Sequence, residues 1–219
     1  MLNIVYNRDC MEGMKEYPNK YFDLAIVDPV YGGVTQGGYM TNEKTTEKLA
    51  KANIYHKSLW NQGKTPKAYF DELFRVSKNQ VIWGGNYFVQ SIARDSQGWI
   101  VWDKENGANN FADCELAYTS FNRATRIFKF RWAGMLQGDM KEKEKRIHPT
   151  QKPVALYEWI LRNYAKEGDK ILDTHVGSGS SRIACAKLGF DFVGYEIDET
   201  YFKLQEERYK NAIWTIPLL

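Results

Sequence analysis

The stretch Lys170–Asp198, "KILDTHVGSGSSRIACAKLGFDFVGYEID", decides the fold class. A short apolar strand, Lys170–Leu172, leads into the glycine turn Gly177–Gly179, and a helical pattern then leads into a second strand that ends at Glu196. This order is typical of a βαβ unit, in which a helix joins two parallel strands. The sequence therefore predicts an α/β fold with a parallel sheet.

The glycine turn also predicts a ligand site. Glycines let a ligand approach the backbone, and the start of the following helix favours an anionic group. Glu196, 17 residues beyond Gly179, stands where nucleotide-binding folds place an acid that binds ribose hydroxyls. Arg182 occupies the third glycine position of the dinucleotide fingerprint, which argues against NAD or FAD. S-adenosylmethionine (AdoMet) has a ribose and a carboxylate but no diphosphate, and it fits this unit.

A second stretch, "FDLAIVDPVYGG" (Phe22–Gly33), ends an apolar strand with a carboxylate, a proline and a large aromatic ring. Ligands of open α/β sheets bind at the carboxyl ends of the strands. We therefore expect the corner Asp28–Tyr31 and the turn Gly177–Gly179 to line one crevice.

Short apolar runs alternate with helical patterns along the rest of the chain. This alternation predicts one domain over residues 1–219, with a mostly parallel sheet and helices on both faces. The expected strands are Phe22–Val27, Gln80–Trp83, Trp99–Trp102, Glu115–Phe121, Ile127–Phe130, Lys170–Leu172 and Phe190–Tyr195. The expected helices are Lys67–Val76, Asn86–Ala93, Val154–Tyr164, Ser180–Leu188 and Glu199–Asn211. We expect Thr65 to cap the first of these, with Pro66 at its first position, and Gly189 to end the fourth.

Composition indicates an ordinary soluble protein of 219 residues, with 43% hydrophobic and 26% charged residues. No apolar run approaches the roughly 18 residues of a membrane helix, and the first residues lack a signal-peptide pattern. The three cysteines form no Cys-x-x-Cys pair, and the three histidines show no ligand spacing. We therefore expect a cytoplasmic protein with reduced thiols and no metal.

A basic segment covers residues 121–147, where eight basic and three acidic residues give a net charge of +5. Aromatic residues interleave with its first cations in "RIFKFRW", a mixture that suits phosphate contacts and base stacking. The candidate DNA-binding residues are Arg123, Arg126, Lys129 and Arg131. A solvated strand face followed by a charged turn remains the alternative. Gly32–Lys64 has little apolar periodicity, and we expect a long functional loop there.

Together these stretches resemble the amino-methylating DNA methyltransferases. Those enzymes carry a catalytic Asp/Ser/Asn-Pro-Pro-Tyr corner and an AdoMet-binding Phe-x-Gly-x-Gly turn. "HPTQKPVALYEWI" (His148–Ile160) is similar to their His-Pro-Thr-x-Lys-Pro segment, and "NRDCMEGM" (Asn7–Met14) to their opening Asp-Cys segment. The corner precedes the glycine turn, as in the permuted subgroup called beta. Two positions depart from the pattern, because Val30 replaces the second proline and His175 the aromatic residue.

The resemblance implies a Rossmann-like AdoMet-dependent methyltransferase fold, with a short target-recognition region at about residues 104–147. It implies site-specific methylation of N6 of a flipped-out adenine in double-stranded DNA, as in restriction-modification, and a homodimer is a possible assembly. By analogy the catalytic residues are Asp28, Pro29 and Tyr31. By analogy the cofactor-binding residues are Asp9, Cys10, His148, Thr150, Asp173, His175, Gly177, Ser178, Gly179 and Glu196. Lys152 is expected to be no more than a solvated lysine.

Several alternatives stay open. N4 of cytosine can use the same chemistry as N6 of adenine, although in the family Asp at the first corner position favours adenine. Methylation of RNA or of a protein amide is a further alternative. Val30 also leaves room for a DNA-binding relative without turnover, and a NAD-dependent enzyme is the most distant reading.

Overall fold

The computed structural model describes residues 2–32, 63–107, 112–133, 136–141 and 143–214. Most of the predicted loop Gly32–Lys64 lies outside the described residues. The main strands are β1 (Asn3–Tyr6), β2 (Phe22–Val27), β3 (Ser77–Trp83), β4 (Ile100–Asp103), β5 (Cys114–Thr119), β6 (Arg126–Lys129), β9 (Lys170–Asp173) and β10 (Asp191–Tyr195). The helices are α1 (Cys10–Met14), α2 (Lys67–Val76), α3 (Val89–Ile92), α4 (Val154–Tyr164), α5 (Ser180–Leu188) and α6 (Glu199–Trp214).

The main strands form one eight-stranded sheet in the order β1-β10-β9-β2-β3-β5-β4-β6. Strand β5 runs antiparallel to its neighbours β3 and β4, and all other pairs in the sheet are parallel. A short hairpin of β7 (Trp132–Ala133) and β8 (Leu136–Gln137) stands apart from it. The prediction of a mostly parallel sheet is confirmed.

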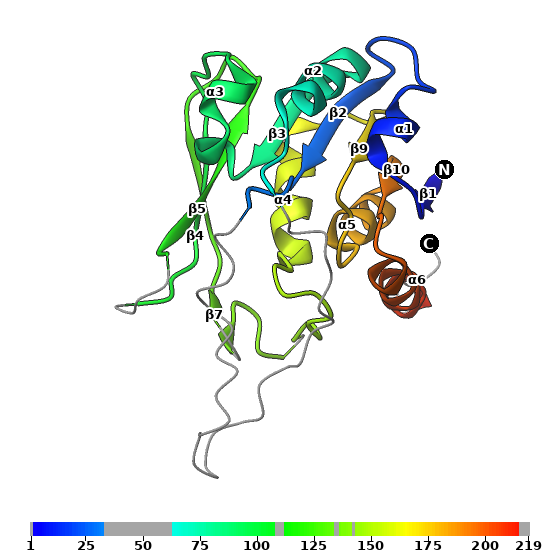
Figure 1. Cartoon of the computed structure of the whole chain (residues 1–219). Coiled ribbons are helices and arrows are strands. Elements are labelled where there is room, and N and C mark those ends of the chain that lie inside the picture. Colours follow the sequence, from blue (N-terminus) through cyan, green and yellow to red (C-terminus); the bar gives the residue numbers. More distant parts are fainter. Residues whose placement is uncertain (1, 33–62, 108–111, 134–135, 142, 215–219) are drawn as a thin grey trace.

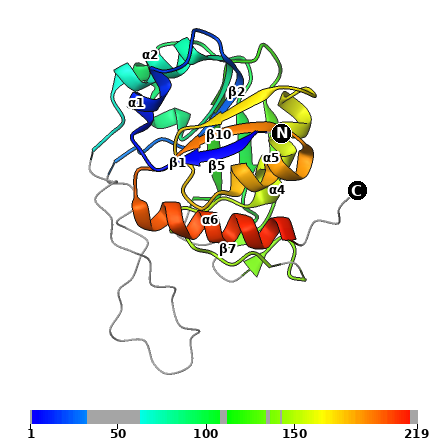
Figure 2. The same ribbon diagram turned by 90° about the vertical axis from the view of Figure 1, so that its right-hand side faces the viewer.

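Helices cover both faces of the sheet (Figure 1). Helices α1 and α2 lie on one face, and Figure 2 shows α6 near α4 and α5 on the other. Neighbouring residues of β2 point to opposite faces. Leu24 and Ile26 accordingly pack with α4 and α5, while Ala25 and Val27 pack with α1 and α2. Burial on both sides explains why this strand is apolar without a break from Leu24 to Val27.

The βαβ unit that opened the sequence is present as β9, α5 and β10. Gly179 precedes α5 with φ of 77°, and Gly189 ends it with φ of 78°, both in the left-handed region that favours glycine. The prediction for Gly189 is confirmed. The predicted cap of α2 is wrong, because Pro66 itself is the N-cap and makes no side-chain cap bond. The Thr65 hydroxyl instead donates to the Val30 carbonyl at 2.8 Å.

Three local predictions differ from the structure. The predicted helix Asn86–Ala93 is a 3₁₀ turn, Gly85–Tyr87, followed by the one-turn helix α3, and Ala93 with φ of 47° ends it. Strand β3 begins earlier than predicted, at Ser77, directly after α2. Strand β1 and helix α1 were not predicted at all, because four and five residues are too short to show a period.

Within the described residues, no helix has the length and apolar character needed to cross a membrane. The same residues contain no group of three or more His, Cys, Asp or Glu side chains able to hold a metal ion.

The face covered by α4 offers a test of the core. Ile160 of α4 is fully buried in the apolar cluster that contains Leu24 and Ile26 of β2, whereas Ile127 on β6 is 59% exposed. We expect Ile160→Ala to lower the free energy of unfolding by about 2–5 kcal/mol, because it leaves a cavity. The matched change Ile127→Ala should cost less than about 0.5 kcal/mol. Urea unfolding of both variants measures the difference, and equal losses would contradict this packing.

Candidate active site

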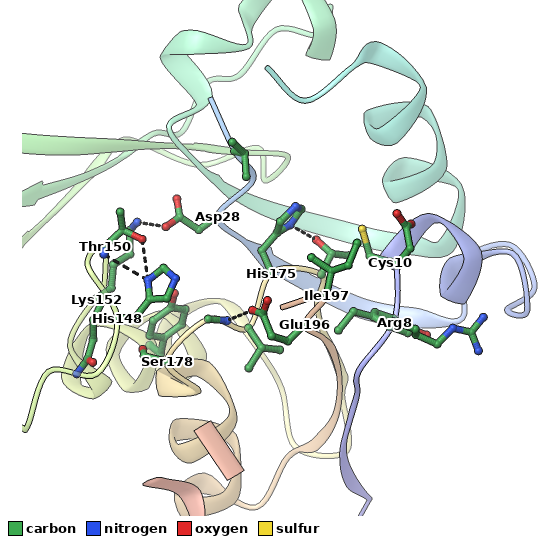
Figure 3. Close-up of a pocket in the computed structure, with 18 residues that line it drawn as sticks. Arg8, Cys10, Asp28, His148, Thr150, Lys152, His175, Ser178, Glu196 and Ile197 are labelled. Carbon is green, nitrogen blue, oxygen red and sulfur yellow. Dashed lines mark hydrogen bonds and ion pairs between the residues drawn. The ribbon is translucent and has the colours of Figure 1, made fainter. Parts of the chain in front are cut away.

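A cavity of about 230 Å³ lies at the carboxyl ends of β1, β2, β9 and β10 (Figure 3). It contains most of the predicted site residues: Asp9, Cys10, Asp28, His148, Thr150, His175, Gly177, Ser178 and Glu196 all line it. These residues follow different strands, or lie in the segment before α4, so only the fold brings them together. The prediction that the corner and the glycine turn share one crevice is confirmed for Asp28 and Val30 of the corner and for Gly177 and Ser178 of the turn.

Four of the predicted catalytic and cofactor-binding residues do not line this cavity: Pro29, Tyr31, Asp173 and Gly179. Asp173 is buried, where its carboxylate accepts the backbone N–H of His175 at 2.9 Å and the hydroxyl of Ser181 at 2.5 Å. Burial raises the pKa of Asp173 to about 7. Asp173 therefore supports the turn from within and does not face a ligand in the cavity.

The carboxylate of Asp28 has two different environments at its two oxygens. Oδ2 accepts a hydrogen bond from the Lys152 ammonium (Figure 3). Oδ1 is buried and has no hydrogen-bond partner among the described residues. An unpaired buried acceptor is costly, so such a group usually serves a ligand or a mechanism.

Lys152 was expected to be a solvated lysine, and this prediction is wrong. Its side chain is only 3% exposed and bridges two carboxylates, Asp28 and Glu115, with Nζ 3.2 Å from Glu115 Oε2. Lys104 contacts the other oxygen of Glu115 at 2.5 Å. A charged side chain is buried only where such partners compensate its lost hydration.

The burial of these charges shifts their pKa values. Burial raises the pKa of Asp28 above its usual value, and the Lys152 ammonium opposes that rise. Burial would lower the pKa of Lys152, but the carboxylates of Asp28 and Glu115 outweigh it and raise the pKa well above its usual value. Lys152 is therefore a stable ammonium ion.

Tyr31, the last residue of the corner, packs against a second aromatic ring. The rings of Tyr31 and Tyr87 are stacked, with centroids 4.8 Å apart and planes inclined by 21°. A Cβ atom at Gly84 would lie 2.8 Å from the Tyr31 ring, so only glycine leaves room for it. The Val30 carbonyl accepts the backbone N–H of Thr65 at 2.9 Å as well as its hydroxyl. Thr65 thus holds the corner at Val30, and Tyr87 packs against it at Tyr31.

Glu196 holds the glycine turn in place at the end of β10. Its carboxylate accepts the backbone N–H of Gly177 at 2.8 Å on one oxygen and that of Asp198 at 2.9 Å on the other. The side chain is buried, yet it lines the cavity. Each carboxylate oxygen has a second lone pair, so Glu196 can still accept hydrogen bonds from a ligand.

Both histidines of the cavity are neutral near pH 7. Burial lowers the pKa of His148 to about 3 and that of His175 to about 4. The His148 ring accepts from the Thr150 backbone N–H at 3.3 Å and lies over the position that a Cβ of Gly177 would take, 3.7 Å away. These rings therefore shape the cavity without adding charge.

Asp9 and Cys10 line the cavity at the start of α1. The Asp9 carboxylate accepts the Met11 backbone N–H at 2.6 Å and so caps the helix. Burial raises the pKa of the Cys10 thiol to about 12. A thiol that stays protonated is a poor nucleophile, so Cys10 has no role as a nucleophile in this cavity.

The four basic residues predicted to bind DNA are not brought together. Arg126 pairs with Ile100 at the start of β4, and Lys129 pairs with Asp103 at its end. At about 3.3 Å per residue, roughly 10 Å of strand separates the two cations. Only Lys129 and the exposed Arg131 lie toward the strand ends that carry the cavity.

Arg123 has a contact within the protein. Its Nη1 donates to the Asn163 carbonyl at 2.6 Å, and its guanidinium lies over the Tyr164 ring, 4.6 Å from the centroid. This cation at the C-terminal end of α4 stabilises the helix dipole. Arg123 is therefore tied to α4.

Sequence reasoning missed the side chains that hold the segment before α4. Arg208 of α6 pairs with Glu144 at 2.5 Å and donates to the Ser178 carbonyl at 2.6 Å. The other oxygen of Glu144 accepts the Val154 backbone N–H at 2.8 Å, at the start of α4. A sequence signal of a buried charge was Glu115, an acid inside the strand "CELAYT".

Comparison with known proteins assigns the family. A model of the DNA methylase family, of the N6/N4 type, matches residues 22–207. The chain belongs to this family. The match spans both the Asp28 corner and the Gly177–Gly179 turn, in the order that the sequence resemblance implied.

Two curated relatives are similar along most of the chain. The type II methyltransferase M2.MboI of Moraxella bovis is 21% identical over 243 residues, which cover 94% of this chain and 86% of that protein. The type II methyltransferase M.HinfI of Haemophilus influenzae is 24% identical over 244 residues, covering 94% of this chain and 68% of that protein.

Solved structures share the fold. M1.HpyAVI, in a complex with SAM, superposes with a TM-score of 0.58 at 21% identity, covering 95% of this chain and 100% of that one. The cytosine-N4-specific PvuII DNA methyltransferase superposes with a TM-score of 0.59 at 10% identity, covering 97% and 91%. The Rossmann-like methyltransferase fold is thereby confirmed.

The buried histidine beside the glycine turn makes stability depend on pH. Between its ordinary value of 6.5 and its folded pKa of about 3, His148 binds a proton only in the unfolded chain. The free energy of unfolding therefore falls as the pH drops through this range. His148→Gln should reduce that slope by up to 1.4 kcal/mol per pH unit, roughly one proton's worth. Urea unfolding between pH 4.5 and 7 measures it.

Asp173, with its raised pKa, contributes with the opposite sign, but it does so equally in both proteins and cancels from the comparison. An unchanged slope in the variant would show that His148 is solvated.

Proposed function

We propose that this chain transfers the methyl group of AdoMet to N6 of adenine in double-stranded DNA. The observation that carries the proposal is the buried, unpaired Oδ1 of Asp28, a residue that lines the same cavity as Gly177, Ser178 and Glu196. A fixed hydrogen-bond acceptor at this position can accept an N–H group of an exocyclic amine.

The residues around the cavity suit AdoMet. Glu196 offers lone pairs for the ribose hydroxyls, and Gly177, with φ of 53°, leaves the backbone open beneath His148. Of the charged residues that line the cavity, Asp28 is paired with Lys152 and Arg8 with Glu16, so the charges of Asp9 and Glu196 remain to favour a cationic ligand. AdoMet supplies an activated methyl group, whose bond to sulfur breaks as the bond to nitrogen forms while the electron pair stays on sulfur.

The corner would prepare the amine for this transfer. The lone pair of an adenine amine is delocalised into the ring, which makes the nitrogen a poor nucleophile. The Asp28 carboxylate and the Pro29 carbonyl can accept its two N–H groups and hold the nitrogen nearer to tetrahedral, which frees the lone pair. After transfer the nitrogen is cationic and loses one proton, which Asp28 is placed to accept. Positioning and fixed acceptors supply the catalysis, with no covalent enzyme intermediate.

The base must leave the duplex to reach the corner. Tyr31 is proposed to stack on the flipped base, which is worth roughly 1–3 kcal/mol. Tyr87 backs the Tyr31 ring and fixes its plane. Region 104–147 is proposed to recognise the target, with Lys129 and Arg131 as phosphate contacts because they lie on the cavity side.

Cytosine N4 is the second candidate, because the two amines can use the same acceptors. The family resemblance favours adenine, since Asp stands at the first corner position. Incubation with labelled AdoMet and mixed-sequence duplex DNA, followed by nucleoside analysis, distinguishes N6-methyladenine from N4-methylcytosine. AdoMet binding without label in DNA would instead indicate a DNA-binding relative without turnover.

Removing the charge of Asp28 tests its role in the reaction. We expect Asp28→Asn to lower kcat at least about 100-fold, because an amide replaces the buried acceptor. AdoMet affinity, measured by calorimetry, should change little. Asp71→Asn is the control, because Asp71 is 61% exposed and, within the described part of the chain, its ion pair is with Lys67 of its own helix. A variant at Asp28 with the activity of this control would refute the assigned role.

Glu196 provides a separate test of the cofactor site. We expect Glu196→Gln to weaken AdoMet binding about 10- to 100-fold, the range for hydrogen bonds to a charged group. Glu199→Gln, an exposed acid in the first turn of α6, is the control and should leave binding unchanged. Equal affinities of the two variants in calorimetry would place the ribose elsewhere.

A further inference from the structure

The two-acceptor mechanism uses Asp28 but gives no role to the charged side chains of Lys152 and Glu115, which are linked to Asp28 by ion pairs. Lys152 bridges Asp28 and Glu115, and Glu115 in turn contacts Lys104. Burying such charges is costly even when they are paired, and a buried pair is weak support for stability. Lys152 contacts one oxygen of Asp28 and leaves the other unpaired, which suggests a role in the reaction.

We propose that Lys152 and Glu115 are positioning residues for Asp28, an inference that rests on the proposed function. Lys152 holds Oδ2 and so directs Oδ1 toward the amine. Glu115 balances the charge of Lys152 and so preserves the negative charge that the amine needs.

The structure holds Lys152 firmly in place. Its backbone carbonyl accepts the Ser180 hydroxyl at 2.7 Å, and its ammonium lies 5.4 Å from the centre of the buried Trp83 ring. The preceding residue is fixed as well, since the Gln151 carbonyl accepts the Trp132 indole N–H at 2.8 Å. The ammonium therefore has little freedom to leave Oδ2, and the carboxylate plane of Asp28 is set by it.

The charge balance explains why a second acid is present. As a pair, Asp28 and Lys152 are neutral and would stabilise a developing cation on the amine nitrogen poorly. With Glu115 the group of three carries a net charge of −1. Lys104 pairs with the far oxygen of Glu115 and acts on Asp28 less strongly than Lys152 or Glu115 does. Glu115 therefore offsets part of the positive charge that Lys152 places beside Asp28.

The two residues act on Asp28 with opposite signs. Without Lys152, the Asp28 carboxylate loses its ammonium partner, and its pKa rises further. Without the charge of Glu115, a repelling carboxylate is gone, and the pKa of Asp28 falls. Because Asp28 must be ionised to accept the amine, the acid limb of the kcat–pH profile follows this pKa.

The test compares Lys152→Met with Glu115→Gln in the full chain. We expect Lys152→Met to lower kcat about 100-fold near neutral pH and to move the acid limb to higher pH. We expect Glu115→Gln to lower kcat about tenfold and to move the acid limb to lower pH. AdoMet affinity should stay within about threefold in both, and Lys152→Arg should restore the acid limb toward its original position.

Glu206→Gln is the matched control, because it removes a carboxylate from the buried Arg182 in a pair that does not line the cavity. It should lower stability without changing kcat or the acid limb. If both site variants lose activity with the acid limb unmoved, their role is structural, and the proposal is wrong. An unchanged or higher kcat in Glu115→Gln also overturns it. Should Lys152→Met fail to fold, Glu115→Gln alone decides.

A readout without turnover separates this proposal from the proposed function. The carboxyl carbon of Asp28, labelled with ¹³C, reports its pKa by NMR in the AdoMet-bound protein. Opposite shifts in the two variants support the positioning role even if no DNA is labelled. Absence of label with the original chain would then contradict the proposed function alone, and equal pKa values in all variants would contradict the positioning role alone.

Discussion

Parallel strand direction is the constraint on which the site depends. Strands β1, β2, β9 and β10 run the same way, so their carboxyl ends meet at one edge of the sheet. Residues far apart in sequence, such as Asp28 and Glu196, thereby line one cavity. Reversal of any of these strands would place its following residue on the opposite edge. The sheet topology thus determines which residues can meet in the cavity.

A second constraint is that the cavity edge carries buried charge. Asp28, Lys152, Glu115 and Glu196 are each held by ion pairs or backbone N–H groups. Such groups reorganise little when a ligand arrives, which is the condition for fixed acceptors to lower a barrier. The stability lost by burying them is offset by the two large apolar clusters on either face of the sheet. The fold therefore tolerates a buried polar site because the apolar core stabilises it.

Sequence reasoning predicted what has a local signature and missed what depends on tertiary contacts. The bounds of the strand Phe22–Val27 were predicted correctly, because burial on both faces makes Leu24–Val27 an unbroken apolar run. Lys152 was misjudged because its partner Asp28 lies 124 residues away. Arg126 and Lys129 were both named as candidate DNA-binding residues, yet the strand carries them toward opposite ends of β4. Spacing in sequence alone could not reveal either arrangement.

Val30, the departure from the Pro-Pro corner, takes on a different meaning in the structure. A proline at this position would supply rigidity, because its ring fixes φ. Here the Val30 carbonyl is held by both the backbone N–H and the hydroxyl of Thr65, and the following Tyr31 pairs with Lys64 in a β-bridge. These contacts restrain the corner from outside, where the proline ring would restrain it from within. The Thr65 hydroxyl, which does not cap α2, therefore supplies part of the rigidity that a second proline would give the corner.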